Sequence, residues 1–318
     1  MNKVINGDCK DVLKTLGSDS VDCIVTSPPY YQLRDYGVDG QIGLENTVDE
    51  YIQNLIEVFR ECKRILKSHG SLWIVISDTY NGDKKGITDR LSSELKDSKI
   101  SKSIGRYRRK TLLAVPSRLE IAMIDDGWIL RNEIIWHKPN MMPQSVKDRF
   151  SVDFEKILFF TKSEQYYFNQ QKEQMITTNI HHLEKGTNTI RKLNRNPDIH
   201  PRGSMGVIGG GNSGRRKQDD QTTYPTDGMR NKRCVWKVPT VPSNISHYAM
   251  FPKSLIRPII KAACQKSGLV MDPFCGAGTT GIVAKEEGCN FLGIELNPEY
   301  SAIASKRIED TLVQEKLF

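Results

Sequence analysis

The residues Ser27-Pro28-Pro29-Tyr30 have the side-chain and backbone groups needed to hold a planar amino group. The serine hydroxyl can donate or accept a hydrogen bond, and the Pro28 carbonyl is a rigidly held acceptor. Tyr30 adds an aromatic face on which a nucleic-acid base can stack. Proline pairs also interrupt many ordinary loops, so the tetrapeptide alone does not establish a site.

The segment before this tetrapeptide predicts where it lies in the fold. The apolar run Cys23-Ile24-Val25 is typical of a buried strand, and the strand must stop at the prolines because proline cannot donate to a strand ladder. Ser27 is therefore expected at the carboxyl end of a strand, where open α/β sheets bind their ligands.

A second element with binding chemistry lies near the other end of the chain, at Gly268-Leu-Val-Met-Asp-Pro-Phe-Cys-Gly-Ala-Gly-Thr-Thr280. Leu269 to Met271 predict a strand, and Gly276 with Gly278 predict a tight loop. A helix is expected from Thr280 to Gly288, ended by the glycine.

A further strand, Asn290 to Glu295, completes a βαβ unit. Glu295 comes seventeen residues after Gly278, close to where nucleotide-binding folds place the carboxylate that accepts from ribose hydroxyls. Thr279-Thr280-Gly281 replaces the spaced third glycine of dinucleotide sites, which favours a nucleoside ligand without a pyrophosphate.

Together the two elements resemble the amino-methylating DNA methyltransferases that use S-adenosylmethionine. In that family Asp-Pro-Phe-x-Gly-x-Gly-Thr binds the cofactor, and (Ser/Asp/Asn)-Pro-Pro-(Tyr/Phe/Trp) holds the target amino group. The catalytic motif precedes the cofactor motif here, as in the permuted β group of the family. The resemblance implies an α/β fold with a Rossmann-like methyltransferase sheet, circularly permuted, and an inserted target-recognition region.

The same resemblance implies roles for individual residues. The catalytic set is Ser27, Pro28, Pro29 and Tyr30. The cofactor-binding set is Asp8, Cys9, Phe251, Asp272, Phe274, Cys275, Gly276, Gly278, Thr279, Thr280 and Glu295. Asp8 matches the aspartate that meets the cofactor's adenine, and Phe251 matches the segment that lines its methionine end.

The middle of the chain supplies ordinary core elements in the family's order. Apolar residues at helical spacing predict an amphipathic helix over Tyr51 to Leu66, and Ser71 to Ile76 read as a buried strand. Residues 127–131 and 133–140 resemble two later strands, and 255–263 a later helix. We predict a catalytic part at 1–164, a target-recognition insertion at 165–234 and a cofactor-binding part at 235–318.

Basic charge is concentrated in two stretches, residues 81–110 and 162–233, each with a net charge of +6, while the remainder carries −4. Such segments release counterions from a polyanion and so bind it without regard to sequence. A solvated loop remains the alternative, above all for 81–110. The predicted DNA-binding residues, all within 165–234, are Arg195, Arg202, Arg215, Arg216 and Lys217.

The sequence argues against a membrane-spanning, a secreted, a metal-binding or a disulfide-rich protein. Hydrophobic residues make up 38% of the chain, no run approaches a membrane span, and residues 1–10 lack the apolar region of a signal peptide. The seven cysteines form no Cys-x-x-Cys pair, and His181-His182 has no third partner, so we assign neither a metal site nor a disulfide framework. A reducing cytoplasm is the expected location.

The chemistry expected is methyl transfer from S-adenosylmethionine to a base that has left the DNA duplex. Attack on cytosine C5 needs a nucleophilic thiolate. The only cysteine in either motif is Cys275, which belongs to the cofactor loop, so methylation of C5 is not expected. Within the family, serine at the first motif position leans to cytosine N4, whereas aspartate or asparagine leans to adenine N6. Ser27 therefore favours cytosine, with adenine as the alternative.

Two other classes of function stay open at this point. A nicotinamide-dependent oxidoreductase would use the glycine loop and Glu295 but leaves Ser27 to Tyr30 unexplained. A DNA-binding module without catalytic activity is the other. RNA is an alternative substrate, although the insertion favours double-stranded DNA. The sequence leaves open a homodimer and a cognate restriction endonuclease as partners.

Overall fold

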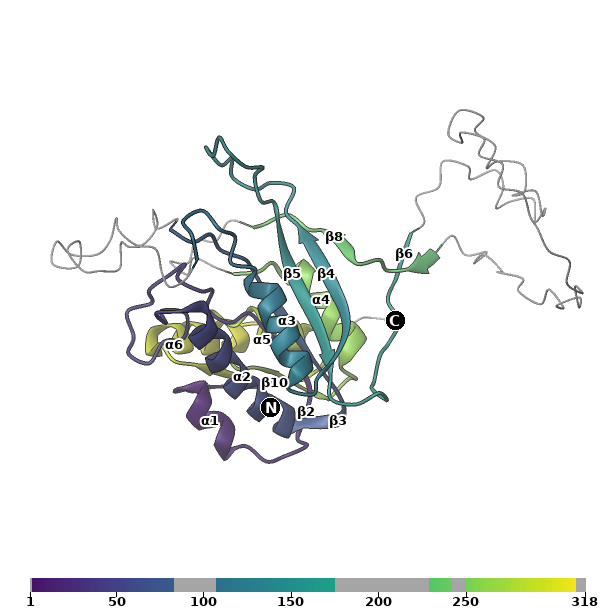
Figure 1. Ribbon diagram of the computed structural model, residues 1–318. Coiled ribbons are helices and arrows are strands. Elements are labelled where there is room, and N and C mark those ends of the chain that lie inside the picture. Colours follow the sequence, from purple (N-terminus) through teal and green to yellow (C-terminus); the bar gives the residue numbers. More distant parts are fainter. Residues whose placement is uncertain (1, 83–106, 175–228, 242–249, 313–318) are drawn as a thin grey trace, which may run out of the picture. The chain divides into compact units, whose positions relative to one another are not determined.

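The computed structural model describes residues 2–82, 107–174, 229–241 and 250–312 (Figure 1). The chain divides into two units, one formed by residues 1–171 with 233–318 and the other by 172–232. In the smaller unit, β6 (Lys172–Gln174) pairs antiparallel with β7 (Met229–Asn231). Arg230 and Glu173 form an ion pair across these strands, with Nε and Oε1 2.9 Å apart.

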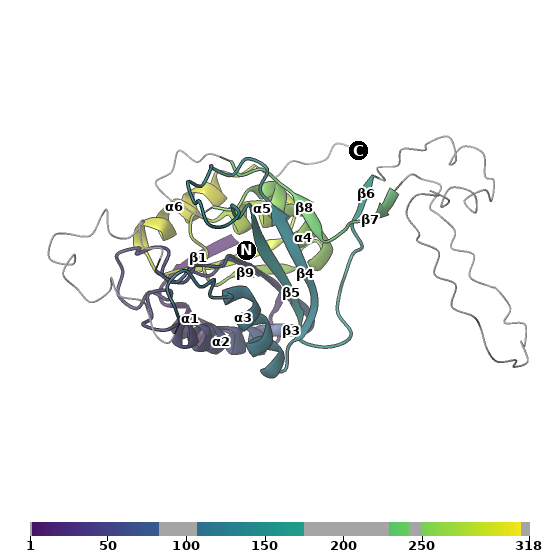
Figure 2. The same cartoon turned by 45° about the horizontal axis from the view of Figure 1, so that its top comes forward.

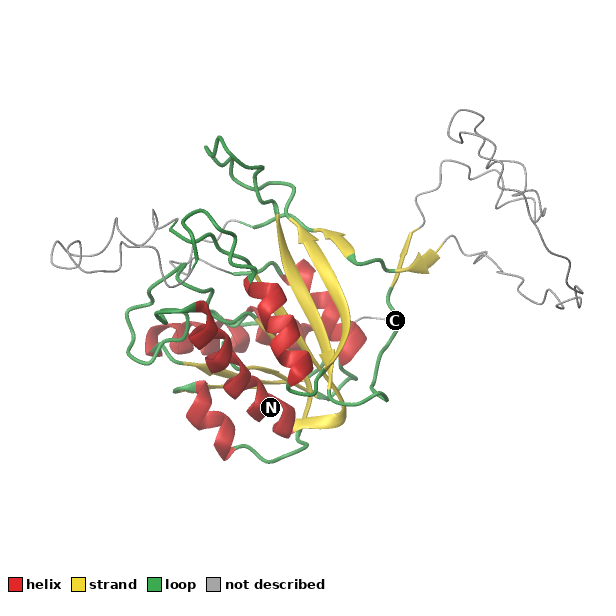
Figure 3. Cartoon of the chain, viewed as in Figure 1, coloured by secondary structure: helices red, strands yellow, loops and turns green. Residues whose placement is uncertain are grey.

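The larger unit contains an eight-stranded sheet in the order β1-β10-β9-β2-β3-β5-β4-β8. Its strands are β1 (Asn2–Asn6), β2 (Val21–Thr26), β3 (Leu66–Ile76), β4 (Ile129–His137), β5 (Phe154–Thr161), β8 (Val235–Lys237), β9 (Leu269–Asp272) and β10 (Asn290–Glu295). β5 runs antiparallel to both of its neighbours, and the other pairs are parallel (Figure 3). The predicted α/β class is confirmed.

Six helices of the described residues cover the two faces of this sheet (Figure 2). α1 (Cys9–Thr15), α2 (Val48–Ile65) and α3 (Val115–Asp125) lie on one face, and α4 (Lys253–Ala263), α5 (Thr279–Glu286) and α6 (Pro298–Glu309) lie on the other. Each face buries its own apolar cluster against the sheet. Covering both faces in this way is what a mostly parallel sheet requires.

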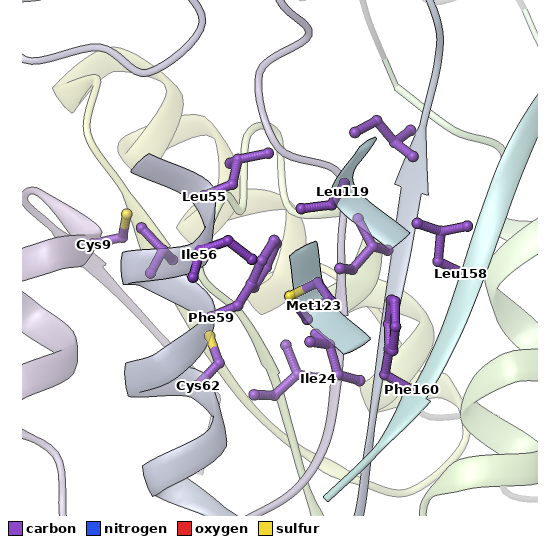
Figure 4. Packing of buried hydrophobic residues seen from close by; sticks show 14 of the residues in the cluster. Cys9, Ile24, Leu55, Ile56, Phe59, Cys62, Leu119, Met123, Leu158 and Phe160 are labelled. Atoms are coloured by element: carbon purple, nitrogen blue, oxygen red, sulfur yellow. The ribbon is translucent and has the colours of Figure 1, made fainter. Parts of the chain in front are cut away.

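The core under the first face shows how the sequence builds α2. Thr47 and Glu50 form a reciprocal capping box that starts the helix, and the buried stripe then includes Leu55 and Phe59. These side chains belong to the same buried cluster as Leu119 of α3 and Phe160 of β5 (Figure 4). The predicted helix start at Tyr51 is three residues late because capping residues are polar and carry no hydrophobic period.

Strand boundaries also differ from the predicted ones. The strand predicted from Ser71 begins at Leu66, directly after α2, and pairs there with Val21. Residues 127–131 and 133–140, predicted as two strands, contribute to the single strand β4, which runs from Ile129 to His137. The polar stretch where they meet, Arg131 to Glu133, gave no hydrophobic signal, but cross-strand pairing with β5 extends through this stretch with one register shift.

The connections leaving β9 and β2 diverge from adjacent strands. β9 leads into α5 on one face of the sheet, whereas β2 leads toward α2 on the opposite face. Diverging connections of this kind open a crevice at the carboxyl ends of the two strands. The order of the sheet positions both sequence motifs at this crevice. The circular permutation that the family resemblance implies stays a prediction.

No helix in the part of the chain that the structure describes combines the length and apolar character needed to cross a membrane.

Candidate functional site

Both sequence motifs line one pocket at the carboxyl ends of β2, β9 and β10. Its walls include Ser27 to Tyr30 from the first motif and Asp272 to Ala277 with Thr279 from the second. The pocket holds about 1070 Å³ of empty space, part of it open to solvent. Residues more than 240 positions apart in the sequence therefore meet in one site.

Asp272 ends β9 and is almost fully buried, at 1% exposure. Its Oδ1 accepts from the Thr26 hydroxyl at 2.6 Å and from the Phe274 backbone N–H at 3.1 Å, while Oδ2 accepts from the Thr280 hydroxyl at 2.7 Å. Burial raises the pKa of Asp272 to about 6. The carboxylate thus holds the glycine loop against the end of β2.

Glu295 ends β10 and places its carboxylate beside the same loop. Oε2 accepts from the Gly276 backbone N–H at 2.7 Å, and Oε1 accepts from the Asn297 backbone N–H at 2.8 Å. Burial raises the pKa of Glu295 above its ordinary value. Asn297 caps α6, so the carboxylate orders both the glycine loop and the start of the next helix.

The loop between β9 and α5 needs its second glycine. Gly278 adopts a φ of 80°, in the left-handed region, and a Cβ at this position would stand 3.0 Å from the Cβ of Ala304 on α6. Gly278 and Thr280 are not among the residues that line the pocket, although both were predicted to bind a cofactor. Both residues support the loop without lining the pocket. Thr280 does so through its hydrogen bond to Asp272.

Cys275 lines the pocket from the same loop but is buried at 5% exposure. Burial raises the pKa of the thiol well above its ordinary value, which keeps the sulfur protonated and a poor nucleophile. A role in packing, close to the backbone of Gly293, fits this position.

The amino-terminal residues of the predicted cofactor set lie in the same pocket. Asp8 caps α1 by accepting from the Lys10 backbone N–H at 2.8 Å, and it lines the pocket with Cys9. Burial and the Asp8 carboxylate raise the pKa of Cys9 to about 12. Phe251 and Phe274 complete the pocket's aromatic lining from the predicted set.

The first motif continues into a series of polar contacts. The Ser27 hydroxyl donates to the Tyr30 phenol oxygen at 3.4 Å, and the Tyr30 hydroxyl donates to Glu155 Oε2 at 2.7 Å. Lys138 forms an ion pair with the other oxygen of Glu155. Burial and the Glu155 charge raise the pKa of Tyr30 well above its ordinary value, so the phenol stays neutral.

A tyrosine of α2 holds the second proline in place. The buried Tyr51 hydroxyl donates to the Pro29 carbonyl at 2.8 Å. Pro28 is itself buried and lines the pocket. The core therefore fixes the position of the tetrapeptide.

Several lining residues escaped the sequence reasoning. Most belong to the loop that follows the first motif: Leu33, Arg34, Tyr36, Val38, Gly40, Gln41 and Ile42. Met250 and Tyr300 line the pocket from the carboxyl-terminal part of the chain. The loop has neither periodicity nor a spaced motif, and its nearness to Ser27 in the sequence was the only available signal.

Some predictions fall on residues that the structure does not describe. Arg195, Arg202, Arg215, Arg216 and Lys217 lie outside the described residues, as do His181-His182 and positions 83–106 of the first basic stretch. Within the described ranges, no group of three or more histidine, cysteine or acidic residues is placed to hold a metal ion.

The sequence profile of a family described as DNA methylase, of the N6/N4 class, matches residues 21–306. The type II methyltransferase M.XycI of Xanthomonas campestris pv. cyanopsidis is 37% identical over 311 residues, which cover 96% of this chain and 87% of that protein. The type II methyltransferase M.Cfr9I of Citrobacter freundii is 37% identical over 314 residues, covering 98% of this chain and 89% of that protein.

Solved structures share the fold at lower identity. The PvuII DNA methyltransferase, cytosine-N4-specific, has a TM-score of 0.60 at 19% identity, with 96% of this chain and 86% of that chain covered. The complex of M1.HpyAVI with SAM has a TM-score of 0.52 at 18% identity, with 96% and 100% covered. The profile and the sequence relatives both span nearly the whole chain, and the chain therefore belongs to the N6/N4 DNA methylase family.

Proposed function

We propose that this DNA methyltransferase transfers the methyl group of S-adenosylmethionine to the N4 amino group of a cytosine that has left the duplex. The observation that carries the proposal is the shared pocket, where Ser27-Pro28-Pro29-Tyr30 faces the glycine loop that follows β9. A base amino group and a nucleoside cofactor could therefore be held within reacting distance.

The residues of the pocket fit a charged nucleoside cofactor. Glu295 lies at the end of β10, where a carboxylate can accept from ribose hydroxyls, and Asp8 lies at the end of the neighbouring β1 near the adenine position that the family resemblance implies. Phe274 and Phe251 offer apolar surface. S-adenosylmethionine, when bound, supplies a methyl group already activated by its sulfonium.

The chain's own residues then have only to position the base and exclude water. The Tyr30 ring is the stacking surface for the extruded base. Ser27 Oγ and the Pro28 carbonyl accept from the amino group and turn its lone pair toward the cofactor side of the pocket. A serine is a poor base at neutral pH, so the amine loses its proton, to Ser27 or to water, after the methyl group has been transferred.

Cytosine is preferred over adenine because of Ser27, the motif position at which the family resemblance links serine to N4 chemistry. The cytosine-N4 specificity in the name of the PvuII enzyme supports this choice through a shared fold. Adenine N6 is the alternative, since both amines can use the same hydrogen bonds.

The type II names of the sequence relatives support a site-specific enzyme of a restriction-modification system, with double-stranded DNA as substrate. In this proposal residues 165–234 read the recognition sequence, with Arg195, Arg202, Arg215, Arg216 and Lys217 as DNA contacts. Residues 1–164 and 235–318 form the permuted catalytic and cofactor-binding parts. A cytoplasmic enzyme with a cognate endonuclease completes the proposal.

Identification of the methylated nucleoside tests the proposal directly. The protein is incubated with methyl-labelled S-adenosylmethionine and mixed-sequence duplex DNA, and the DNA is digested to nucleosides and separated. Labelled N4-methylcytosine supports the proposal. Labelled N6-methyladenine as the only product would contradict the base choice, and NAD binding without methyl transfer would contradict the reaction itself.

A further inference from the structure

A second layer of polar residues lies behind the catalytic tetrapeptide. Tyr30 donates its hydroxyl hydrogen to Glu155 at 2.7 Å, and Lys138 pairs with the same carboxylate. The Lys138 ammonium also lies 4.2 Å from the centre of the Trp136 ring. The side chains of Lys138 and Glu155 are only 11% and 12% exposed.

Stabilisation of the fold does not by itself account for the ion pair between Lys138 and Glu155. Two charges withdrawn from water lose hydration that their attraction only partly restores, and such pairs are often no more stabilising than apolar residues of equal size. The strands β4 and β5 are already joined by antiparallel pairing along most of their length. The distinctive contact of Glu155 is the one it makes with Tyr30.

The direction of the hydrogen bonds gives the pair a function. An ionised carboxylate only accepts, so the single hydrogen of the Tyr30 hydroxyl is committed to Glu155. The phenol oxygen can then only accept from Ser27, which directs the Ser27 hydroxyl hydrogen toward Tyr30. The lone pairs of Ser27 Oγ are left to accept from an amino group in the pocket.

We propose that Glu155, held by Lys138, is a positioning residue that fixes the Ser27 hydroxyl as an acceptor for the target amino group. The inference rests on the proposed amino methyl transfer, and it assigns roles to two residues outside both sequence motifs. Neither residue touches the reacting atoms. Both act through Tyr30.

A double-mutant cycle tests this mechanism. Glu155→Gln keeps the size of the side chain, but its amide can donate as well as accept, so the direction of the Tyr30 hydroxyl is no longer fixed. The single-turnover rate should fall roughly 10- to 100-fold, the scale of a misplaced reacting group, with dissociation constants for DNA and S-adenosylmethionine within about threefold of wild type. Tyr30→Phe should slow the reaction similarly and keep the stacking ring.

The decisive comparison is Glu155→Gln in the Tyr30→Phe background, where it should have no further effect on the rate. The proposal would be overturned if the two rate losses multiplied in the double variant. An unchanged rate in Glu155→Gln, or losses confined to binding, would overturn it as well. Glu133→Gln is the matched control, because Glu133 pairs with Lys156 on the same two strands and is 39% exposed. It should leave the rate unchanged.

The partner lysine provides a second route that does not depend on the glutamate variant folding. Lys138→Arg should keep the ion pair and most of the rate, whereas Lys138→Met should behave as Glu155→Gln does. Equal rates in these two variants would contradict the role of the pair. The wild-type product is identified in the same assay, so a wrong base assignment shows in the product and a wrong positioning role shows in the rate ratios.

Discussion

The hydroxyl of Thr26 donates to Oδ1 of Asp272 over 2.6 Å, and both residues are buried. Thr26 is the last residue of β2, immediately before Ser27, and Asp272 is the last residue of β9. One hydrogen bond therefore joins the strand that carries the catalytic motif to the strand that carries the cofactor loop. Its partners are separated by 246 positions in the sequence.

Replacement of Thr26 by valine should test this connection. Valine keeps the shape of the side chain but leaves Asp272 one donor short in a buried position, which should cost about 1–3 kcal/mol of the free energy of unfolding. Urea titration measures the loss. Thr15→Val is the control, because the Thr15 hydroxyl donates to the Val12 carbonyl at the exposed end of α1. A loss no larger than that of the control would contradict the assigned connection.

Asp272 should also give the protein a specific dependence on pH. Its pKa in the folded protein is about 6, above the ordinary 3.8, so the folded state holds this proton more tightly than the unfolded chain. Stability from this group is present at low pH and is lost as pH rises from about 4 to about 6. Asp272→Asn removes the titration while keeping the size of the side chain.

The wild type should therefore gain stability relative to Asp272→Asn on acidification from pH 7 to pH 4. The expected shift is on the order of 3 kcal/mol, since each pKa unit corresponds to about 1.4 kcal/mol. Other titrating groups cancel in the difference. Parallel stability curves for the two proteins would show that Asp272 keeps an ordinary pKa.

Glu295→Ala should weaken binding of S-adenosylmethionine by roughly 1.5–3 kcal/mol, the scale of a hydrogen bond to a charged group. Titration calorimetry measures the change. Because Glu295 also accepts from the Asn297 N–H at the start of α6, a purely structural role predicts lower stability with intact affinity. Glu299→Ala, at an exposed position in the first turn of α6, should change neither quantity.

Ser27→Ala should slow the chemical step while leaving the affinities for cofactor and DNA nearly intact. The hydroxyl contributes mainly when the amino group attacks, so its loss should appear in kcat and little in the dissociation constants. Single-turnover rates measured beside equilibrium binding separate the two effects. A loss of DNA affinity with an unchanged rate would assign Ser27 to binding alone.

Charge reversal at Arg215, Arg216 and Lys217 should weaken binding to duplexes of any sequence. Phosphate contacts release counterions, so the dependence of the binding constant on salt concentration should also become flatter. Fluorescence anisotropy over a salt series measures both. Lys14→Glu is the control, on exposed surface of α1. Unchanged affinity and salt slope would show that residues 215–217 do not contact DNA.

The sequence predicted the parts of this site that obey local rules. The prolines that follow Ser27 end β2, and glycines shape the loop before α5. An acidic residue ends β10. At each of these points the residue type indicates the backbone position. The loop after Tyr30 has no such rule, because its place over the pocket depends on distant residues such as Tyr300 of α6, whose ring packs edge-on against Tyr36. Glu155 and Lys138 looked like ordinary charged residues, since only folding brings them to Tyr30.

The sheet order also determines when this enzyme can become active during its own synthesis. β1 and β2 leave the ribosome well before β9 and β10, which occupy the places beside them in the sheet. Until residue 295 has emerged, facing edges of the two early strands remain unpaired, a state that invites aggregation. The cofactor pocket of a nascent chain is therefore incomplete until β9 and β10 have been synthesised.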